Sequence, residues 1–197
     1  FVLFFAINLF TNANAQVVVN EYSASNLTQF VDNHSDFEDW IELYNSGTTS
    51  VNLGGYYLSD DSIKNTKYQI PAGTFISAGG YLRFWCSGRN NFSGNNYHTS
   101  FRITQTKNNG EDIVFSDPSG VIIDGTDVLK TQNGHSRGRT TDGGSTWGIF
   151  IIPTPNATNN LSTSYTRYAD KPDFFYNAGF YTGSLTYFMS TTETNAT

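Results

Sequence analysis

The sequence predicts an all-β protein whose main body is a sandwich of two packed sheets. Short runs rich in Val, Ile, Phe, Tyr and Thr recur between Gly, Asn, Asp and Pro residues, as they do in strands separated by turns. Helical periodicity is hard to find after Gln16. Regularly spaced turn signals without intervening helices favour a sandwich over a parallel α/β sheet.

The first fifteen residues are similar to the end of a secretory signal. An apolar block at 1–10 leads to Ala13-Asn14-Ala15, a small-x-small pattern that is typical of a cleavage site. The alternative, a transmembrane helix, needs about 20 apolar residues and is disfavoured. We therefore expect part of a signal peptide at 1–15 and a mature chain from Gln16. Such a chain is secreted or lies at the cell surface, without membrane insertion after signal removal.

The predicted strands follow one another with an alternation of apolar and polar residues. The first covers residues 16–22. In the run 39–44 the alternation places Ile41 and Leu43 on the same face. Further strands are expected at residues 51–53, 56–58, 68–70, 75–76, 81–85, 101–103, 112–115, 121–124 and 147–150, with a short extended segment before the last of these.

Proline and glycine residues explain where these strands end. Pro71 has no N–H to donate to a ladder and so ends the strand at 68–70. Residues 77–80 contain two glycines and predict a tight connection, because glycine tolerates positive φ. Residues 108–110 and 117–120 have the composition of turns.

Two polar segments remain as loops, and they are where we expect a binding function. They are residues 28–38, within the polar connection after the first strand, and residues 87–100, which we expect to form a long Asn- and Gly-rich loop. Long loops of this kind are either functional or simply tolerated.

Charge and cysteine content exclude several classes of protein. The net charge is −6 with scattered acidic residues, whereas binding to nucleic acid phosphates requires a basic face. Cys86 is the single cysteine and cannot form an internal disulfide, so we expect a buried or semi-buried thiol. Aromatic residues make up 16% of the chain and charged residues only 14%, a balance that suits β-strands.

Motifs in a fixed order run through the main body. They include Asn20 and Glu21; Asp39, Trp40, Ile41, Glu42, Leu43 and Asn45; Gly55, Leu58 and Asp60; Asp124; Ser136, Gly138 and Arg139; Asp142 and Gly143; Trp147; Pro153 and Pro155. Together they resemble the lamin tail domain in its bacterial, exported form. The resemblance implies an immunoglobulin-like β-sandwich over residues 16–160, in which these positions have structural roles. It supplies no catalytic residues and implies a non-catalytic interaction or adaptor domain. Tyr56, where Trp is common, and the long loop at 87–100 depart from the pattern.

The C-terminal residues resemble a different module. After a polar linker at 161–170, residues 171–197 look like the opening strands of a chitobiase/hexosaminidase C-terminal-like β module, here truncated. This resemblance implies the N-terminal part of a larger bacterial extracellular protein. One alternative is the accessory region of a secreted enzyme, such as a spore-coat-type kinase, nuclease, phosphoesterase or other hydrolase, with its catalytic domain beyond Thr197.

A calcium site is the alternative interpretation of the acidic stretch 32–39. Carboxylate and amide oxygens are ligands for calcium, and Asp32 and Asp36 are candidates, with Asp60 approaching from a neighbouring strand end. The spacing lacks the central Gly and terminal Glu of the twelve-residue calcium loop, so a solvated loop is the favoured interpretation.

The remaining candidates favour binding over catalysis. The histidines at positions 34, 98 and 135 have no metal-binding spacing, and we expect them to be exposed in loops. A glycosidase carboxylate pair among Glu38, Glu42 and Asp60 is disfavoured, because the family pattern explains two of the three. Four aromatic residues, if exposed, are candidates for stacking on sugars or for binding another protein: Trp40, Tyr44, Tyr165 and Tyr168. Ordinary packing in the core or on a strand face is the favoured interpretation. The expected partner is an unknown protein or a polysaccharide at the cell surface.

Overall fold

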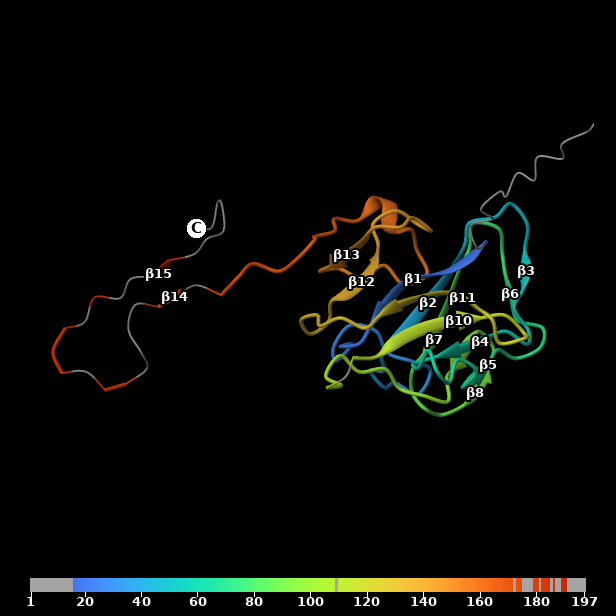
Figure 1. The fold of residues 1–197 in the computed structure, drawn as a ribbon, viewed down its shortest axis with the longest axis horizontal. Helices are drawn as coiled ribbons and strands as arrows, with labels where there is room; N and C mark the ends of the chain where they lie inside the picture. The colour runs from blue at the N-terminus through green and yellow to red at the C-terminus, as the bar shows by residue number, and fades with distance from the viewer. Residues whose placement is uncertain are drawn as a thin grey trace, which may run out of the picture.

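The computed structural model describes residues 16–108 and 110–171, and the short stretches 173–174, 179–180, 182–184, 186 and 189–190. The predicted signal at 1–15 lies outside the described residues. Figure 1 shows a body of two β layers. Within the described residues the only helical segment is one 3₁₀ turn, η1 (Asn159–Leu161), which confirms the all-β prediction. The described part of the chain contains no helix of the length and apolarity needed to span a membrane.

The larger layer is a seven-stranded sheet. Its order is β13-β12-β1-β2-β7-β9-β8, and every neighbouring pair is antiparallel except β7 and β9. The strands are β1 (Val17–Ser23), β2 (Trp40–Asn45), β7 (Tyr81–Trp85), β8 (Asn91–Ser93), β9 (Asn96–His98), β12 (Ser136–Arg139) and β13 (Trp147–Phe150). The predicted sandwich layer is therefore built around β1 and β2, at the centre of this sheet.

The second layer is a four-stranded antiparallel sheet. Its order is β11-β10-β4-β5, and a separate pair joins β3 to β6. These strands are β3 (Val51–Asn52), β4 (Tyr57–Ser59), β5 (Tyr68–Gln69), β6 (Phe75–Ile76), β10 (Asp112–Ser116) and β11 (Ile122–Asp127). The turn before β4 requires a glycine, because Gly55 has a φ of +90°, which other residues rarely adopt.

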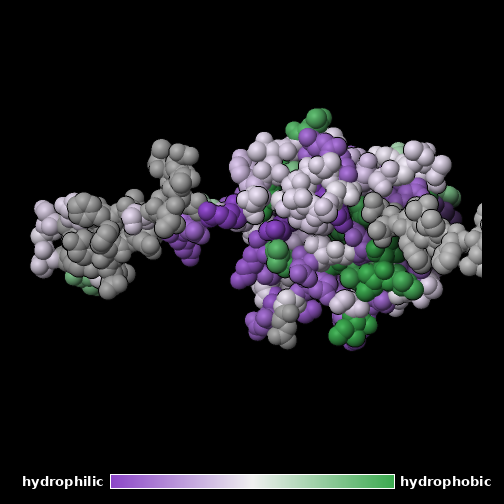
Figure 2. Space-filling model, turned by 45° about the horizontal axis from the view of Figure 1, so that its top comes forward, coloured by the Kyte–Doolittle hydropathy of each residue, from purple (hydrophilic) through white to green (hydrophobic). Residues whose placement is uncertain are grey.

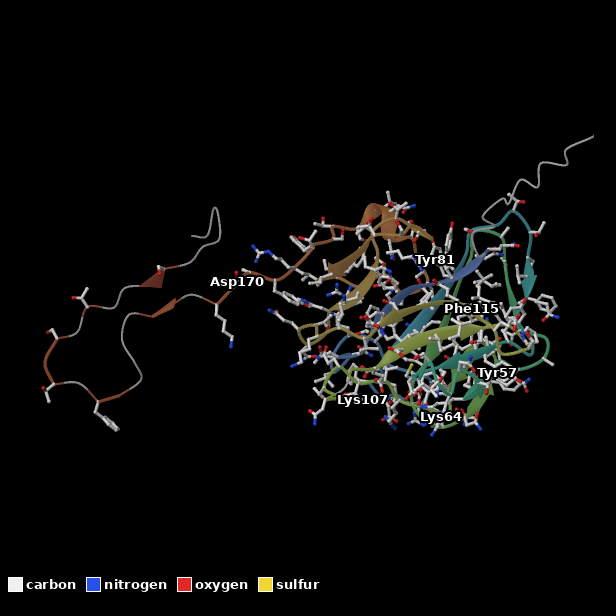
Figure 3. All side chains as sticks on the ribbon, in the orientation of Figure 1. Tyr57, Lys64, Tyr81, Lys107, Phe115 and Asp170 are labelled. Carbon is white, nitrogen blue, oxygen red and sulfur yellow. The ribbon has the colours of Figure 1, made fainter. Side chains whose placement is uncertain are left out.

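The core lies between the two sheets. Ile41 and Leu43 are fully buried on the inner face of β2, as their alternation predicts, and they belong to the same cluster as Phe84 and Phe115. Figure 3 shows Phe115 among the strands, with Lys64 and Lys107 at the lower rim of the body. Burying each such side chain stabilises the fold by about 1.5–3 kcal/mol.

The outer face of the seven-stranded sheet is also covered, which the alternation does not predict. All seven residues of β1 are buried. Trp40, on the outer face of β2, is fully buried, and the ring of Phe30 packs edge-on to it at 6.3 Å. The burial of Trp40 agrees with ordinary packing, the favoured interpretation of these aromatics, and leaves its ring unable to stack on a sugar. Tyr165, by contrast, is 47% exposed.

The loop predicted at 87–100 is largely an ordered hairpin of β8 and β9. The Thr99 N–H donates to the Trp85 carbonyl at 2.8 Å and continues the parallel pairing of β9 with β7. Backbone pairing of this kind needs no β-branched side chains, so an Asn- and Gly-rich sequence conceals it. Conversely, residues 101–103 form no strand, although Phe101 and Ile103 are buried.

The predicted linker at 161–170 makes contacts with the sandwich. Tyr165 pairs with Ile149 of β13 through two backbone hydrogen bonds of 2.7 and 2.9 Å. The hydroxyl of Tyr168 lies 2.9 Å from the His135 ring nitrogen Nδ1. Further along, β14 (Asp173–Phe174) pairs with β15 (Met189–Ser190), to the left of the sandwich in Figure 1. The start of the predicted linker therefore extends the edge of the seven-stranded sheet.

Candidate functional site

The two loops expected to carry function meet at one end of the sandwich. The first is the β1–β2 loop (residues 24–39), and the second precedes β8; both lie toward the lower end of the body in Figure 1. The Arg89 guanidinium, from the second loop, lies 3.1 Å from a carboxylate oxygen of Asp32 and 3.0 Å from one of Glu38. It also forms an ion pair with Asp36. One arginine therefore joins the two loops through three carboxylates.

Hydrogen bonds within the β1–β2 loop hold its shape independently of Arg89. The side-chain amide of Asn26 donates to the carbonyl of Phe30 at 2.6 Å and to that of Glu38 at 2.8 Å. The Asn26 N–H donates to an Asp39 carboxylate oxygen at 2.9 Å. Asp32 accepts from the N–H groups of two nearby residues, an Asx-type turn. The loop is therefore a folded element rather than a solvated coil.

His98 forms a second connection between the loops. It is fully buried, so the prediction of an exposed histidine at position 98 is wrong. Its Nε2 lies 2.7 Å from the Asn33 side-chain oxygen and its Nδ1 lies 2.9 Å from the Ser87 hydroxyl. Burial lowers the pKa of His98, despite the nearby Asp32 carboxylate, which acts in the opposite direction. A neutral imidazole is therefore the favoured state at neutral pH.

The structure brings together only part of the predicted calcium site. Oxygens of Asp32, Asp36 and Glu38 all lie within 4.8 Å of one another, whereas Asp60 does not belong to this group and instead pairs with Lys67 at 2.7 Å. Glu38 was not among the predicted ligands. The guanidinium of Arg89 contacts all three carboxylates and supplies the positive charge that a cation would bring. Calcium binding stays a prediction.

The β1–β2 loop presents apolar side chains to solvent. Leu27, Val31 and Phe37 are 61%, 50% and 46% exposed. Figure 2 shows mostly hydrophilic side chains on the visible face of the body, with hydrophobic ones in separate patches. Three large apolar side chains on one ordered loop are an uncommon feature of a surface, because exposed apolar groups usually occur singly.

Most of the motif residues form a buried polar network away from these loops. Asn20 occupies a β-bulge in β1, and its side chain donates to Asp142 at 3.0 Å and accepts from the Gly143 N–H at 3.1 Å. Burial acts to raise the pKa of Asp142, but hydrogen bonds, the strongest from Thr158 and Tyr81, lower it below its usual range. The network therefore ties the bulge to the turn between β12 and β13.

Two glutamates lie opposite each other at the centre of this network. Glu21 of β1 pairs in register with Glu42 of β2, and both are fully buried. Glu21 accepts hydrogen bonds from Ser136 at 2.5 Å and from the Thr154 hydroxyl at 2.7 Å. Glu42 accepts from the Asn156 N–H, and its Oε1 has no hydrogen-bond partner within the described residues.

Burial is the main cause that raises the pKa of both carboxyl groups. For Glu42 the rise is large, and the charge of Glu21 adds to it. For Glu21, the hydrogen bonds from Ser136 and Thr154 partly offset the effect of burial. Thr154 and Asn156 donate hydrogen bonds to Glu21 and Glu42 and cover them, so the two carboxyl groups have a structural role rather than a catalytic one in an open cleft.

An ion pair links the two layers of the sandwich. Arg139 of β12 contacts both carboxylate oxygens of Asp124 on β11 at 2.9 Å. Asp124 also accepts from the Val19 N–H at 2.7 Å, and the Arg139 Nε donates to the Val19 carbonyl at 2.8 Å. Position 138, beside them, requires a glycine, because a Cβ there would be 2.8 Å from the Asn159 side chain. These motif positions therefore serve packing and sheet-to-sheet attachment.

Comparison with known proteins gives the family of the main body. A comparison with curated proteins finds no match. A model of the family described as the lamin tail domain matches residues 11–130, which is more than half of the chain. Domains of this family are immunoglobulin-like and typically non-catalytic interaction modules. Because this match covers more than half of the chain, and because the two sheets have the expected all-β architecture, the chain belongs to the lamin tail domain family.

Proposed function

We propose that this chain is a secreted or cell-surface adaptor that binds another protein through its β1–β2 loop. The observation that carries the proposal is the exposure of Leu27, Val31 and Phe37 on a loop whose backbone is fixed by internal hydrogen bonds and by Arg89. Secretion is supported by the apolar run at 1–10 with its small-x-small motif.

The rigidity of the loop favours tight binding. Association costs free energy when loops and side chains become ordered, and a loop that is already ordered avoids much of that cost. The ion pairs of Arg89 and the hydrogen bonds of Asn26 order the β1–β2 loop in the free protein. The apolar side chains are therefore presented in a fixed arrangement to a partner with a complementary apolar surface.

A cell-surface binding experiment tests this proposal. The whole chain, fluorescently labelled, is added to intact producing cells, with and without prior protease treatment of the cells. We expect saturable binding that protease treatment removes and that the double change Leu27→Ser and Phe37→Ser reduces at least about tenfold. Ile63→Ser is the matched control, because Ile63 is 92% exposed outside this loop. Protease-resistant binding, or equal loss in the control, would contradict the proposal.

We also propose that the adaptor belongs to a larger bacterial extracellular protein, either adhesive or enzymatic. The resemblance of residues 171–197 to a second β module supports this, as does the pairing of β14 with β15. In the enzymatic case the catalytic domain lies beyond Thr197 and this chain positions it. Sequencing the gene downstream tests the choice: a kinase or hydrolase domain supports the enzymatic form, and an anchoring tail supports the adhesive one.

A further inference from the structure

Arg83 has an unusual environment on the outer face of the seven-stranded sheet. It lies on β7 opposite Glu42, but its guanidinium stacks over the Trp85 ring, 3.9 Å from the ring centroid. Within the described residues the guanidinium has neither a hydrogen bond nor an ion pair, in contrast to Arg89 and Arg139. A cation–π contact fixes the plane of the group and leaves its N–H donors free.

Arg83 and Trp85 both line a pocket of about 460 Å³. Its other walls include Phe75 and Tyr81 and the side chains of Asn95 and Asn96. The pocket exists because β9 pairs with β7 only at Phe84 and Trp85, so no described strand lies beside the first part of β7. Tyr81, labelled in Figure 3, lies on the upper side of the body. A volume of this size lies within the range of small-molecule sites.

We propose that this pocket binds a carboxylate-bearing sugar, a uronic acid residue of an acidic polysaccharide. A guanidinium presents parallel N–H donors that match the two oxygens of a carboxylate. The amides of Asn95 and Asn96 offer donors as well as acceptors, which is what neighbouring sugar hydroxyls require. Phe75 is 59% exposed and provides an apolar ring face at the rim.

The lining favours a sugar over an acidic peptide. Polar groups in the pocket are mostly side-chain amides and hydroxyls, which can satisfy a ring with several hydroxyl groups. None of the lining residues belongs to the β1–β2 loop, so this site is separate from the proposed protein-binding surface and its test is independent of that proposal.

Calorimetric titration of the whole chain with trigalacturonate tests the proposal. Fully methyl-esterified trigalacturonate is the matched ligand, since it keeps the hydroxyls and loses the charges. We expect trigalacturonate to bind at least about tenfold more tightly than the ester, because charge-assisted hydrogen bonds are the stronger ones. Arg83→Met keeps the length of the side chain over Trp85 and should remove most of this difference. Arg137→Met removes the same charge outside the pocket and should leave binding unchanged.

A second variant tests the site without altering its buried part. Asn95 is exposed at the rim, so Asn95→Asp adds a negative charge there with little effect on folding. It should weaken binding of trigalacturonate by a larger factor than binding of the ester, because both ligands lose the amide donor but only trigalacturonate is repelled by the added charge. The proposal is wrong if trigalacturonate does not bind, if the ester binds as well, or if Arg83→Met has no effect. Binding of hexaglutamate as tight as that of trigalacturonate, and equally dependent on Arg83, would overturn it in favour of an acidic peptide.

Discussion

Two buried glutamates show how the same residue type serves different purposes a few ångströms apart. Glu21 accepts hydrogen bonds from Ser136 and from both the N–H and the hydroxyl of Thr154. Glu42 accepts one from Asn156, and its other oxygen is buried without a partner in the described part of the chain. A carboxylate surrounded by donors is stabilised in its charged form, whereas one without them favours the proton.

This difference predicts opposite effects of removing each charge. Glu42→Gln should raise the free energy of unfolding at neutral pH, because it replaces a buried carboxyl whose ionised form is destabilised by burial and by Glu21. Glu21→Gln should lower it by about 1–3 kcal/mol, since Ser136 and Thr154 lose acceptors inside the protein. Urea unfolding of the two variants at neutral pH measures both values. Equal effects of the two changes would contradict the assignment.

The pH dependence of stability has a defined sign. The folded pKa of Glu42 is raised well above the ordinary value of 4.5, so its contribution is fully present below about pH 4.5 and is lost as the pH rises through the folded pKa. Glu21 contributes in the same direction. Melting temperatures should therefore fall as the pH rises above 4.5, and Glu42→Gln should flatten this decline. An unchanged slope in the variant would show that another group causes it.

At the scale of elements, the β1–β2 loop depends on an ion-pair network that crosses to another loop. Asp32 has a fully buried side chain, and Arg89 is its cationic partner. Arg89→Met keeps most of the packing and removes the charge. Backbone amide exchange in residues 26–38 should then increase by about tenfold or more, while exchange in β1 and β2 stays the same. Uniform exchange across the whole sandwich would instead indicate that Arg89 supports the fold globally.

The same network makes a specific prediction for calcium. Because Arg89 occupies the space between Asp32, Asp36 and Glu38 and offsets part of their charge, calcium should raise the melting temperature only slightly in the natural chain. In Arg89→Met only Glu38 keeps a cationic partner, Arg102, and millimolar calcium should raise the melting temperature by several degrees. If a chelator reverses the rise in melting temperature, bound calcium is its cause. The absence of a shift in the variant would remove the calcium hypothesis.

Sequence reasoning predicted those elements whose signal is local. Alternation in β2 correctly placed Ile41 and Leu43 in the core, and the turns predicted at residues 77–80 and 117–120 contain glycines with positive φ, Gly79 and Gly120. The β8–β9 hairpin was missed because its pairing with β7 is non-local and leaves no pattern in its own residues. The burial of His98 was missed for the same reason, since its partners Asn33 and Ser87 come from other segments.

Arg89 was also missed as part of the candidate site, although a signal for it existed. An arginine at the start of a long polar loop, in a chain with a dense acidic stretch elsewhere, is a candidate partner for that stretch. Arg83 had no such signal, because it lies in an ordinary alternating strand. That its guanidinium stacks on Trp85 and forms no ion pair within the described residues becomes visible only when the cross-strand neighbours are known.

At the scale of the whole molecule, the two sheets are joined by the contact of Arg139 with Asp124 as well as by the apolar core. Arg139 is nearly buried and bonds both carboxylate oxygens of Asp124 and the Val19 carbonyl. Breaking a buried pair leaves an uncompensated charge, so Asp124→Ala should lower the free energy of unfolding by about 3–5 kcal/mol.

A second substitution, in an exposed ion pair, serves as the control for Asp124→Ala. Asp170→Ala removes a carboxylate from an exposed ion pair with Arg167 and should cost less than about 1 kcal/mol. Chemical denaturation of the two variants provides the comparison. If Asp124→Ala were as stable as Asp170→Ala, the apolar core alone would hold the two layers together.

Site-specific photo-crosslinking tests the central claim, that this lamin tail domain binds a protein through its β1–β2 loop. A photoreactive amino acid is placed at Val31, which is half exposed on that loop, and separately at Ile63, which is 92% exposed elsewhere. The account predicts one discrete crosslinked protein on intact cells from position 31, competed by the unlabelled chain, and none from position 63. The same products from both positions, or none from position 31, would contradict it.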